Sequence, residues 1–198
     1  MRPVSFGGTG LFSRRRHPQD KMNYQTLDEA YAANDAIRSK LKATVSALSE
    51  EQLDTRPDGE KWSIRQIVEH VAMVNDGAVR ICTRLLSKAE QAGRPANGFH
   101  VSNEFVEKGA GVAGVKLEAP EIVHPVAGAS LADSIAKLDA SSEAMRMLRE
   151  KFEEFDGTEP KFPHPYFGDL SAQEWFVLSG AHEGRHLGQI RRILEKLG

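Results

Sequence analysis

The sequence predicts an all-α protein, a four-helix bundle in which the helices run up-down-down-up. Three observations predict this fold class. Four long segments carry apolar residues at helical spacing, each segment begins with a residue that can cap a helix, and residues 91–129 form a long connection between the second and third segments. Since antiparallel neighbours need only a short loop, a connection of that length allows two successive helices to run parallel.

Capping patterns followed by apolar stripes predict the first two helices. Thr26, with Glu29 three residues later, opens the first helix, and Ser63, with Gln66 three residues later, opens the second. We expect both stripes to face the core. The apolar residues are Leu27, Ala30, Tyr31, Ile37, Leu41, Val45 and Leu48 in the first helix, and Ile64, Ile67, Val68, Val71, Val74, Ala78, Ile81 and Leu85 in the second.

The third helix is predicted over residues 130–155 and the fourth from Ser171, where Glu174 completes a second capping box with a serine. The segment between them is rich in proline, glycine and other turn residues, which predicts a loop. Within the long connection, a short extended piece over residues 122–126 is expected. No segment of the chain predicts a sheet convincingly.

Composition fits one globular domain and excludes several classes of protein. Hydrophobic residues make up 40% of the 198 residues, charged residues make up 27%, and the formal net charge is −2. This balance predicts no nucleic-acid partner, and the lack of a run of 18 apolar residues predicts no membrane span. The one cysteine, Cys82, cannot form an internal disulfide and suits a reducing compartment, so we expect a cytoplasmic protein.

Residues 1–26 differ from the rest and are predicted to be a disordered N-terminal extension. They carry a formal charge of +4, which leaves −6 on residues 27–198, and they lack both an apolar period and the hydrophobic run of a signal peptide. A transit peptide and an anion-binding arm are the alternatives. Either Met1 or Met22 can be the biological start. We expect the folded domain to span residues 27–198.

Three of the seven histidines lie on predicted helices and suggest a metal site. His182 and His186 are four residues apart, so their imidazoles project from one helix face about 40° apart, and Gln189 joins the same stripe. His70 lies at the edge of the apolar stripe of the second helix. Three imidazoles on two helices of one bundle would hold a divalent ion and leave a coordination position open. The alternative is a set of separate core histidines, each bonded to a backbone carbonyl or to water.

The residues from His182 to His186 also match the H-E-x-x-H pattern of zinc proteases, in which the glutamate is the general base. We expect no protease activity, because neither the glycine nor the third histidine of the extended pattern follows and no sheet is predicted beside the helix. Glu183 is therefore interpreted as a solvated or interface carboxylate.

Gly180, Gly184 and Gly188 form a stripe nearly opposite the two histidines of the last helix. Each glycine in a helix costs roughly 1 kcal/mol relative to alanine. The spacing predicts a close approach of another helix, either within the bundle or across a dimer interface.

The blocks KWSIRQIVEHVA and FPHPYFGDLSAQEWFVLSGAHEGRHLGQIRRIL make residues 27–198 resemble the DinB-like family of metal-binding four-helix bundles. The resemblance rests on the Trp-Ser opening followed by a histidine, the Phe-Gly turn before the last helix and the final His-x-x-x-His-x-x-Gln run. It implies that His70, His182 and His186 hold a divalent ion. It also implies an up-down-down-up fold, a homodimer and, in some members, thiol-dependent S-transferase or isomerase activity with a low-molecular-weight thiol.

Metal-assisted activation of a thiol or a water is the chemistry that would follow. We expect a thiol to be transferred to a small-molecule substrate, with a metal-dependent hydrolase or a non-enzymatic, metal-stapled interaction or stress protein as alternatives. Imidazole ligands suit zinc, nickel or iron. Gln189, Asn34 and Asn75 are candidates for hydrogen bonds around the ligands or the substrate, although buried polar residues often have purely structural partners.

Overall fold

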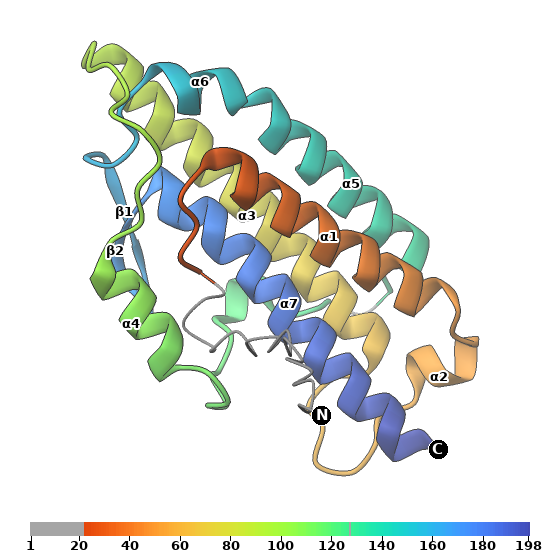
Figure 1. The fold of residues 1–198 in the computed structure, drawn as a ribbon. Coiled ribbons are helices and arrows are strands. Elements are labelled where there is room, and N and C mark those ends of the chain that lie inside the picture. Colours follow the sequence, from red (N-terminus) through yellow and green to blue (C-terminus); the bar gives the residue numbers. More distant parts are fainter. Residues whose placement is uncertain (1–21, 127) are drawn as a thin grey trace, which may run out of the picture.

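Four long helices form the bundle in the computed structural model, which describes residues 22–126 and 128–198 (Figure 1). They are α1 (Leu27–Ser46), α3 (Ile64–Gln91), α5 (Leu131–Met147) and α7 (Ala172–Leu197). Helices α1 and α7 run in one direction and α3 and α5 in the other, so the predicted up-down-down-up bundle is confirmed. Helix α3 packs against α5 and α7, and α1 packs against α7.

The predicted caps form at the starts of the helices. In α3 and α7 the capping box is complete, because the Ser63 and Ser171 side chains accept from the third helical N–H while the side chain at that position accepts from the serine N–H. The box at α1 is half formed. Thr26 accepts from the Glu29 N–H at 3.1 Å, but the Glu29 carboxylate accepts from the Gln25 N–H instead. Each such cap stabilises its helix by about 1 kcal/mol.

The helices differ from the prediction in two places. A short helix, α2 (Glu50–Asp54), lies in the connection between the first two long helices, where no helix was predicted. The third predicted helix is broken at Leu148, whose N–H donates to the Met145 carbonyl three residues back, and continues as α6 (Arg149–Glu154). That tightened turn ends α5 without a helix-breaking residue, so the sequence carries no signal for it.

The connection before α7 contains a hairpin, so the expectation of no sheet was wrong. Strands β1 (Lys161–His164) and β2 (Gly168–Ser171) pair antiparallel, and Gly168 has a φ of +75°, which glycine adopts readily. Proline in both the strand and the turn concealed the pattern. The hairpin packs against the start of α7, where the Trp175 indole N–H donates to the Phe162 carbonyl at 3.1 Å.

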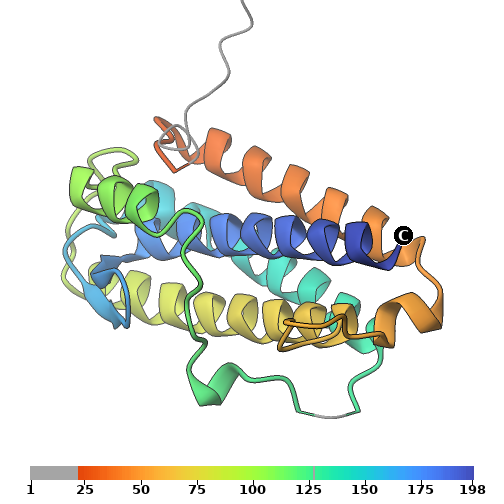
Figure 2. The same cartoon turned by 90° about the horizontal axis from the view of Figure 1, so that it is seen from below.

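The crossover from α3 to α5 contains α4 (Asn103–Gly111) and a single 3₁₀ turn, Glu121–Val123. The extended piece expected over residues 122–126 was therefore wrong in part, since hydrogen bonds close a turn at its start. After α4 the chain crosses the outer face of α7 and α3 before it reaches α5 (Figure 2).

The packed domain begins before the predicted boundary at residue 27. Met22 is buried in the core, and its sulfur lies against Gly109 of α4. A single buried methionine in an otherwise polar stretch is too weak a signal to move a domain boundary. The rest of the predicted extension, residues 1–21, lies outside the described residues.

Two apolar clusters fill the bundle, one toward α4 and the hairpin and the other toward α2. On α7 the first cluster reaches Ala181 and the second starts at Leu187, and on α3 the change lies between Ala72 and Ala78. Polar and ionisable side chains occupy the layer between the clusters. Within the described residues, no helix is both long and apolar enough to cross a membrane.

Candidate metal centre

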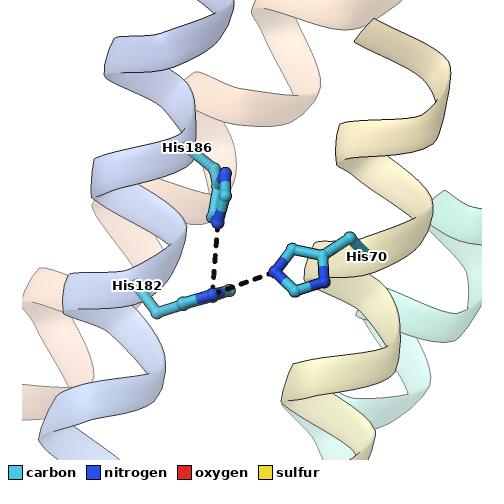
Figure 3. Close-up of side chains that lie close together, drawn as sticks. All are labelled: His70, His182 and His186. Atoms are coloured by element: carbon cyan, nitrogen blue, oxygen red, sulfur yellow. Dashed lines mark hydrogen bonds between the residues drawn. The ribbon is translucent and has the colours of Figure 1, made fainter. Parts of the chain in front are cut away.

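The three helical histidines meet at one point of this polar layer (Figure 3). The Nε2 atom of His182 lies 3.2 Å from Nε2 of His70 and 3.2 Å from Nε2 of His186. One ligand atom from each ring falls within 4.8 Å of the others. Two rings come from successive turns of α7 and the third from α3, so the packing of these antiparallel helices brings the three together.

Two of the rings are fixed by hydrogen bonds from their outer nitrogens. His70 Nδ1 lies 2.7 Å from the carbonyl oxygen of Val123, and His186 Nδ1 lies 2.9 Å from Oε1 of Gln189. Because each partner oxygen is an acceptor, Nδ1 is the donor in both rings, and the Nε2 lone pairs face His182. Of the described polar atoms, Nδ1 of His182 is one of two that are buried without a hydrogen-bond partner.

Burial keeps the three imidazoles neutral. It lowers the pKa of His186 to about 3, lowers the pKa of His70, and places the pKa of His182 well below its usual value. Neutral imidazole is the form that binds metal. The Nε2 lone pairs of His70 and His186 both point at His182, whose neutral ring can carry only one proton on Nε2. That proton can satisfy one lone pair, whereas a cation shared by the three Nε2 atoms would satisfy all of them. The donor set therefore fits a divalent ion.

Trp62 adds an aromatic wall that the sequence analysis did not assign to the site. Its ring centroid lies 4.8 Å from that of His70 and 5.7 Å from that of His124 in the crossover. Trp62 directly precedes the Ser63 cap of α3, so the capped start of the helix sets its position. The signal for this contact in the sequence is the spacing: Trp62 precedes His70 by eight residues, or about two helical turns.

The three polar candidates for hydrogen bonds around the site separate into two groups. Gln189 contacts His186, as described above. Asn34 and Asn75 do not belong to the cluster, which corrects the prediction: Asn34 donates to the Phe176 carbonyl at 3.2 Å, and Asn75 accepts from Arg38 at 3.1 Å. Asn34 lies on α1 and bonds to the backbone of α7, although its Oδ1 is buried without a hydrogen-bond partner, and Asn75 on α3 accepts from the buried charge of Arg38.

Glu183 is buried, and its interpretation as a solvated or interface carboxylate was wrong. It is 1% exposed and pairs with Arg38 of α1 at 2.7 Å. Burial raises the pKa of Glu183, and the adjacent Arg38 guanidinium opposes that shift. Arg38 also donates to the Leu138 carbonyl of α5. The pair therefore links α1, α5 and α7 on a face of α7 that is turned about 100° from His182.

Comparisons with known proteins agree with this architecture. A model of the DinB superfamily matches residues 33–190. The chain is 28% identical over 160 residues to the uncharacterized protein YuaE of Bacillus subtilis (strain 168), covering 77% of this chain and 90% of that protein. Among solved structures it is similar to TT2238, described as a four-helix bundle protein, with a TM-score of 0.55, 25% identity, and coverage of 84% of this chain and 99% of that one.

Proposed function

The chain belongs to the DinB superfamily, and from this membership and the histidine cluster we propose that it is a divalent-metal protein whose ion is held by His70, His182 and His186. The observation that carries the proposal is the approach of three neutral Nε2 atoms to within 4.8 Å of one another. Separate core histidines would each face a partner of their own, whereas here two lone pairs point at the third ring.

A divalent ion with three imidazole ligands keeps a coordination position open, and it lowers the pKa of a thiol or water bound there. The protein's own residues prepare that position. Val123 and Gln189 orient two of the rings, burial holds the ligands neutral, and Trp62 shields the His70 ring on one side.

Transfer of a low-molecular-weight thiol to a small-molecule electrophile is the reaction class that we favour. A hydrolase would gain from a carboxylate general base, but the two carboxylates adjacent to ligands in the sequence are committed elsewhere. Glu183 pairs with Arg38, and Glu69 accepts from the Val126 N–H at 3.0 Å. A metal-bound water can ionise without a base, but hydrolysis of an ester or amide also needs a proton donor for the leaving group, and neither carboxylate is free to be that donor. Attack by a thiolate on an activated electrophile needs no such acid, so we favour thiolate chemistry.

Metal analysis tests the first part of the proposal. Protein purified without a metal-affinity step is expected to contain, or to take up, close to one equivalent of divalent ion, and the His182→Ala variant is expected to lose it. His100→Ala is the matched control, because His100 is exposed and its imidazole bonds only to the Asn97 carbonyl of its own loop, while its backbone N–H, which donates to Gln173, is kept in the variant. Wild-type protein that binds no divalent ion tightly would overturn the proposal.

Trp62 supplies an optical reading of the same site. Ni²⁺ or Co²⁺ bound beside His70 is expected to quench its fluorescence, since the rings are 4.8 Å apart. Trp62→Phe should retain the metal but lose the quenching, which leaves Trp175 as the remaining fluorophore. With loaded protein, thiol–electrophile pairs are then compared with esters and amides. Turnover of the esters or amides alone would favour the hydrolase, and a fall in melting temperature in His70→Ala with no turnover to lose would favour a non-enzymatic role.

A further inference from the structure

Residues 112–126, which we call the strap, cross the outside of α3 and α7 (Figure 2), and Val123 within the strap contacts His70 of the histidine cluster. None of these fifteen described residues is buried. Even the apolar side chains of Ile122 and Val126 are 85% and 68% exposed. Apart from the partly buried Val112 and the contact of His124 with Trp62, the strap has little packing to hold it, so its position depends largely on individual polar contacts.

One of those contacts is made by a proposed metal ligand. The Nδ1–H of His70 donates to the Val123 carbonyl at 2.7 Å, so the strap supplies the acceptor that orients this ring. When an imidazole coordinates a cation, its remaining N–H becomes a stronger donor. An ion on Nε2 of His70 would therefore strengthen the bond that holds the strap.

Other contacts tie the strap to the same region of the molecule. Arg185, next to ligand His186, donates to the carbonyls of Val112 and Val115 at the start of the strap. Tyr166 of the hairpin turn donates from its hydroxyl to the Glu118 carbonyl at 2.6 Å. At the far end, the Glu69 carboxylate accepts from the strap backbone, as described above. The strap thus spans from a residue beside one ligand to a residue beside another.

We propose that Arg185 and Tyr166 are positioning residues for the metal centre. They hold the strap, the strap places the Val123 carbonyl, and that carbonyl orients His70. Closure of the strap and metal binding are then coupled, so each strengthens the other by the same factor. This inference rests on the proposed metal-binding function. It assigns a role to the crossover, whose length otherwise serves only to join two parallel helices.

Trypsin reports on the strap directly, because Lys116 is exposed within it and is followed by Leu117. We expect zinc to slow cleavage after Lys116 by about tenfold or more, in line with the usual effect of groups that support metal ligands. Cleavage is assigned by the mass of the 117–198 fragment, and Lys116→Gln must abolish it. Trypsin is kept low so that the rate follows the equilibrium between open and closed strap.

Tyr166→Phe removes one anchor without touching a histidine. It is expected to speed cleavage of the metal-free protein and to weaken zinc binding, each by roughly three- to tenfold, the worth of one hydrogen bond. Ile122→Ala is the matched control in the strap, because this exposed side chain anchors nothing, and it should change neither quantity. Far-ultraviolet circular dichroism checks that each variant is folded.

The outcomes separate the two proposals. Failure of the wild type to bind zinc overturns the metal-binding function, and this inference with it. Zinc that binds through the three histidines while the rate of cleavage after Lys116 stays the same overturns the inference alone. A third outcome is that Tyr166→Phe is cleaved faster than the wild type while binding zinc equally well. That result would show that the strap covers the site without affecting zinc binding, and it would overturn the inference.

Discussion

At the scale of single residues, two neighbours on α7 point toward different partners. His182 faces the other histidines at the α3 side, whereas Glu183, about 100° further round, faces Arg38 inside the bundle. The pattern H-E-x-x-H therefore combines two members of the histidine cluster with a structural carboxylate. The ion pair supports the helix that carries the histidines, but the glutamate does not point into the cluster.

Glu183→Gln is expected to lower the free energy of unfolding by roughly 3 kcal/mol, because Arg38 would remain in a largely buried position without its counter-charge. Urea unfolding of the metal-free protein measures this change. Metal content should stay at the wild-type level. The double variant Arg38→Met with Glu183→Leu should recover part of the loss, since it removes both charges together. A variant with wild-type stability and lost turnover would instead favour the general-base role.

Sequence reasoning found the histidines but not the partners of their neighbours. An i, i+4 pair is a local pattern, and a third histidine on an apolar stripe adds to it. Arg38 lies 145 residues from Glu183 along the chain, and nothing local distinguishes it from a surface arginine. The two asparagines were misplaced for the same reason, since an inward helix face predicts burial but not which other buried group will be reached.

At the scale of elements, the glycine stripe of α7 shows how closely α1 packs against α7 along its length. A Cβ added at Gly180 would lie 1.7 Å from Oδ1 of Asn34, and one at Gly184 would lie 3.5 Å from Ile37. Gly188 faces only Arg192 of its own helix, at 3.7 Å. The close approach predicted from the spacing therefore occurs at the first glycine, within the bundle, and relaxes along the helix.

Alanine at these positions should have effects of opposite sign. Gly180→Ala is expected to destabilise the protein by about 1–3 kcal/mol, because Asn34 has to move. Gly188→Ala is expected to stabilise it by up to about 1 kcal/mol through helix propensity. Both are measured by urea unfolding. Adding Asn34→Ala to Gly180→Ala should restore most of the loss, whereas equal effects at the two glycines would contradict this account of the packing.

Element starts were predictable and short irregular elements were not. Thr26, Ser63, Ser130 and Ser171 all cap helices where the sequence placed them, because capping is a local interaction between neighbouring residues. The hairpin and the 3₁₀ turn depend on contacts across the molecule. Trp175 and the start of α7 support β1, whereas the turn residue Val123 bonds to His70 of α3.

At the scale of the whole molecule, the buried and half-buried histidines make stability depend on pH. His164 lies on the hairpin, with its ring centroid 5.2 Å from those of Trp175 and Phe167, and burial lowers its pKa from 6.5 to about 4. Its folded pKa is below its unfolded value, so its contribution is complete above about pH 6.5 and is lost as the pH falls through about 4. The lowered pKa values of the three clustered histidines act in the same direction.

The metal-free protein should accordingly lose stability between pH 7 and pH 4. His164→Asn is expected to make that loss smaller by roughly 1–2 kcal/mol, which is less than the full pKa shift implies because the ring is partly exposed and solvent screens its charge. Asparagine can still accept from the Tyr166 N–H and does not titrate. Urea unfolding at a series of pH values measures the slope. An unchanged slope in the variant would show that His164 is accessible enough to titrate normally.

His70 and His182 are separated by 112 residues of chain, in a protein whose single cysteine forms no disulfide. An ion held by both would act as a reversible cross-link that closes a very long loop. In the chain-entropy account, closing a loop of about that length lowers the entropy of the unfolded chain and so stabilises the folded protein by roughly 4–5 kcal/mol. Unlike a covalent bridge, this link strengthens by about 1.4 kcal/mol for each tenfold rise in free ion. The lifetime of the folded protein would then follow the metal supply of its surroundings.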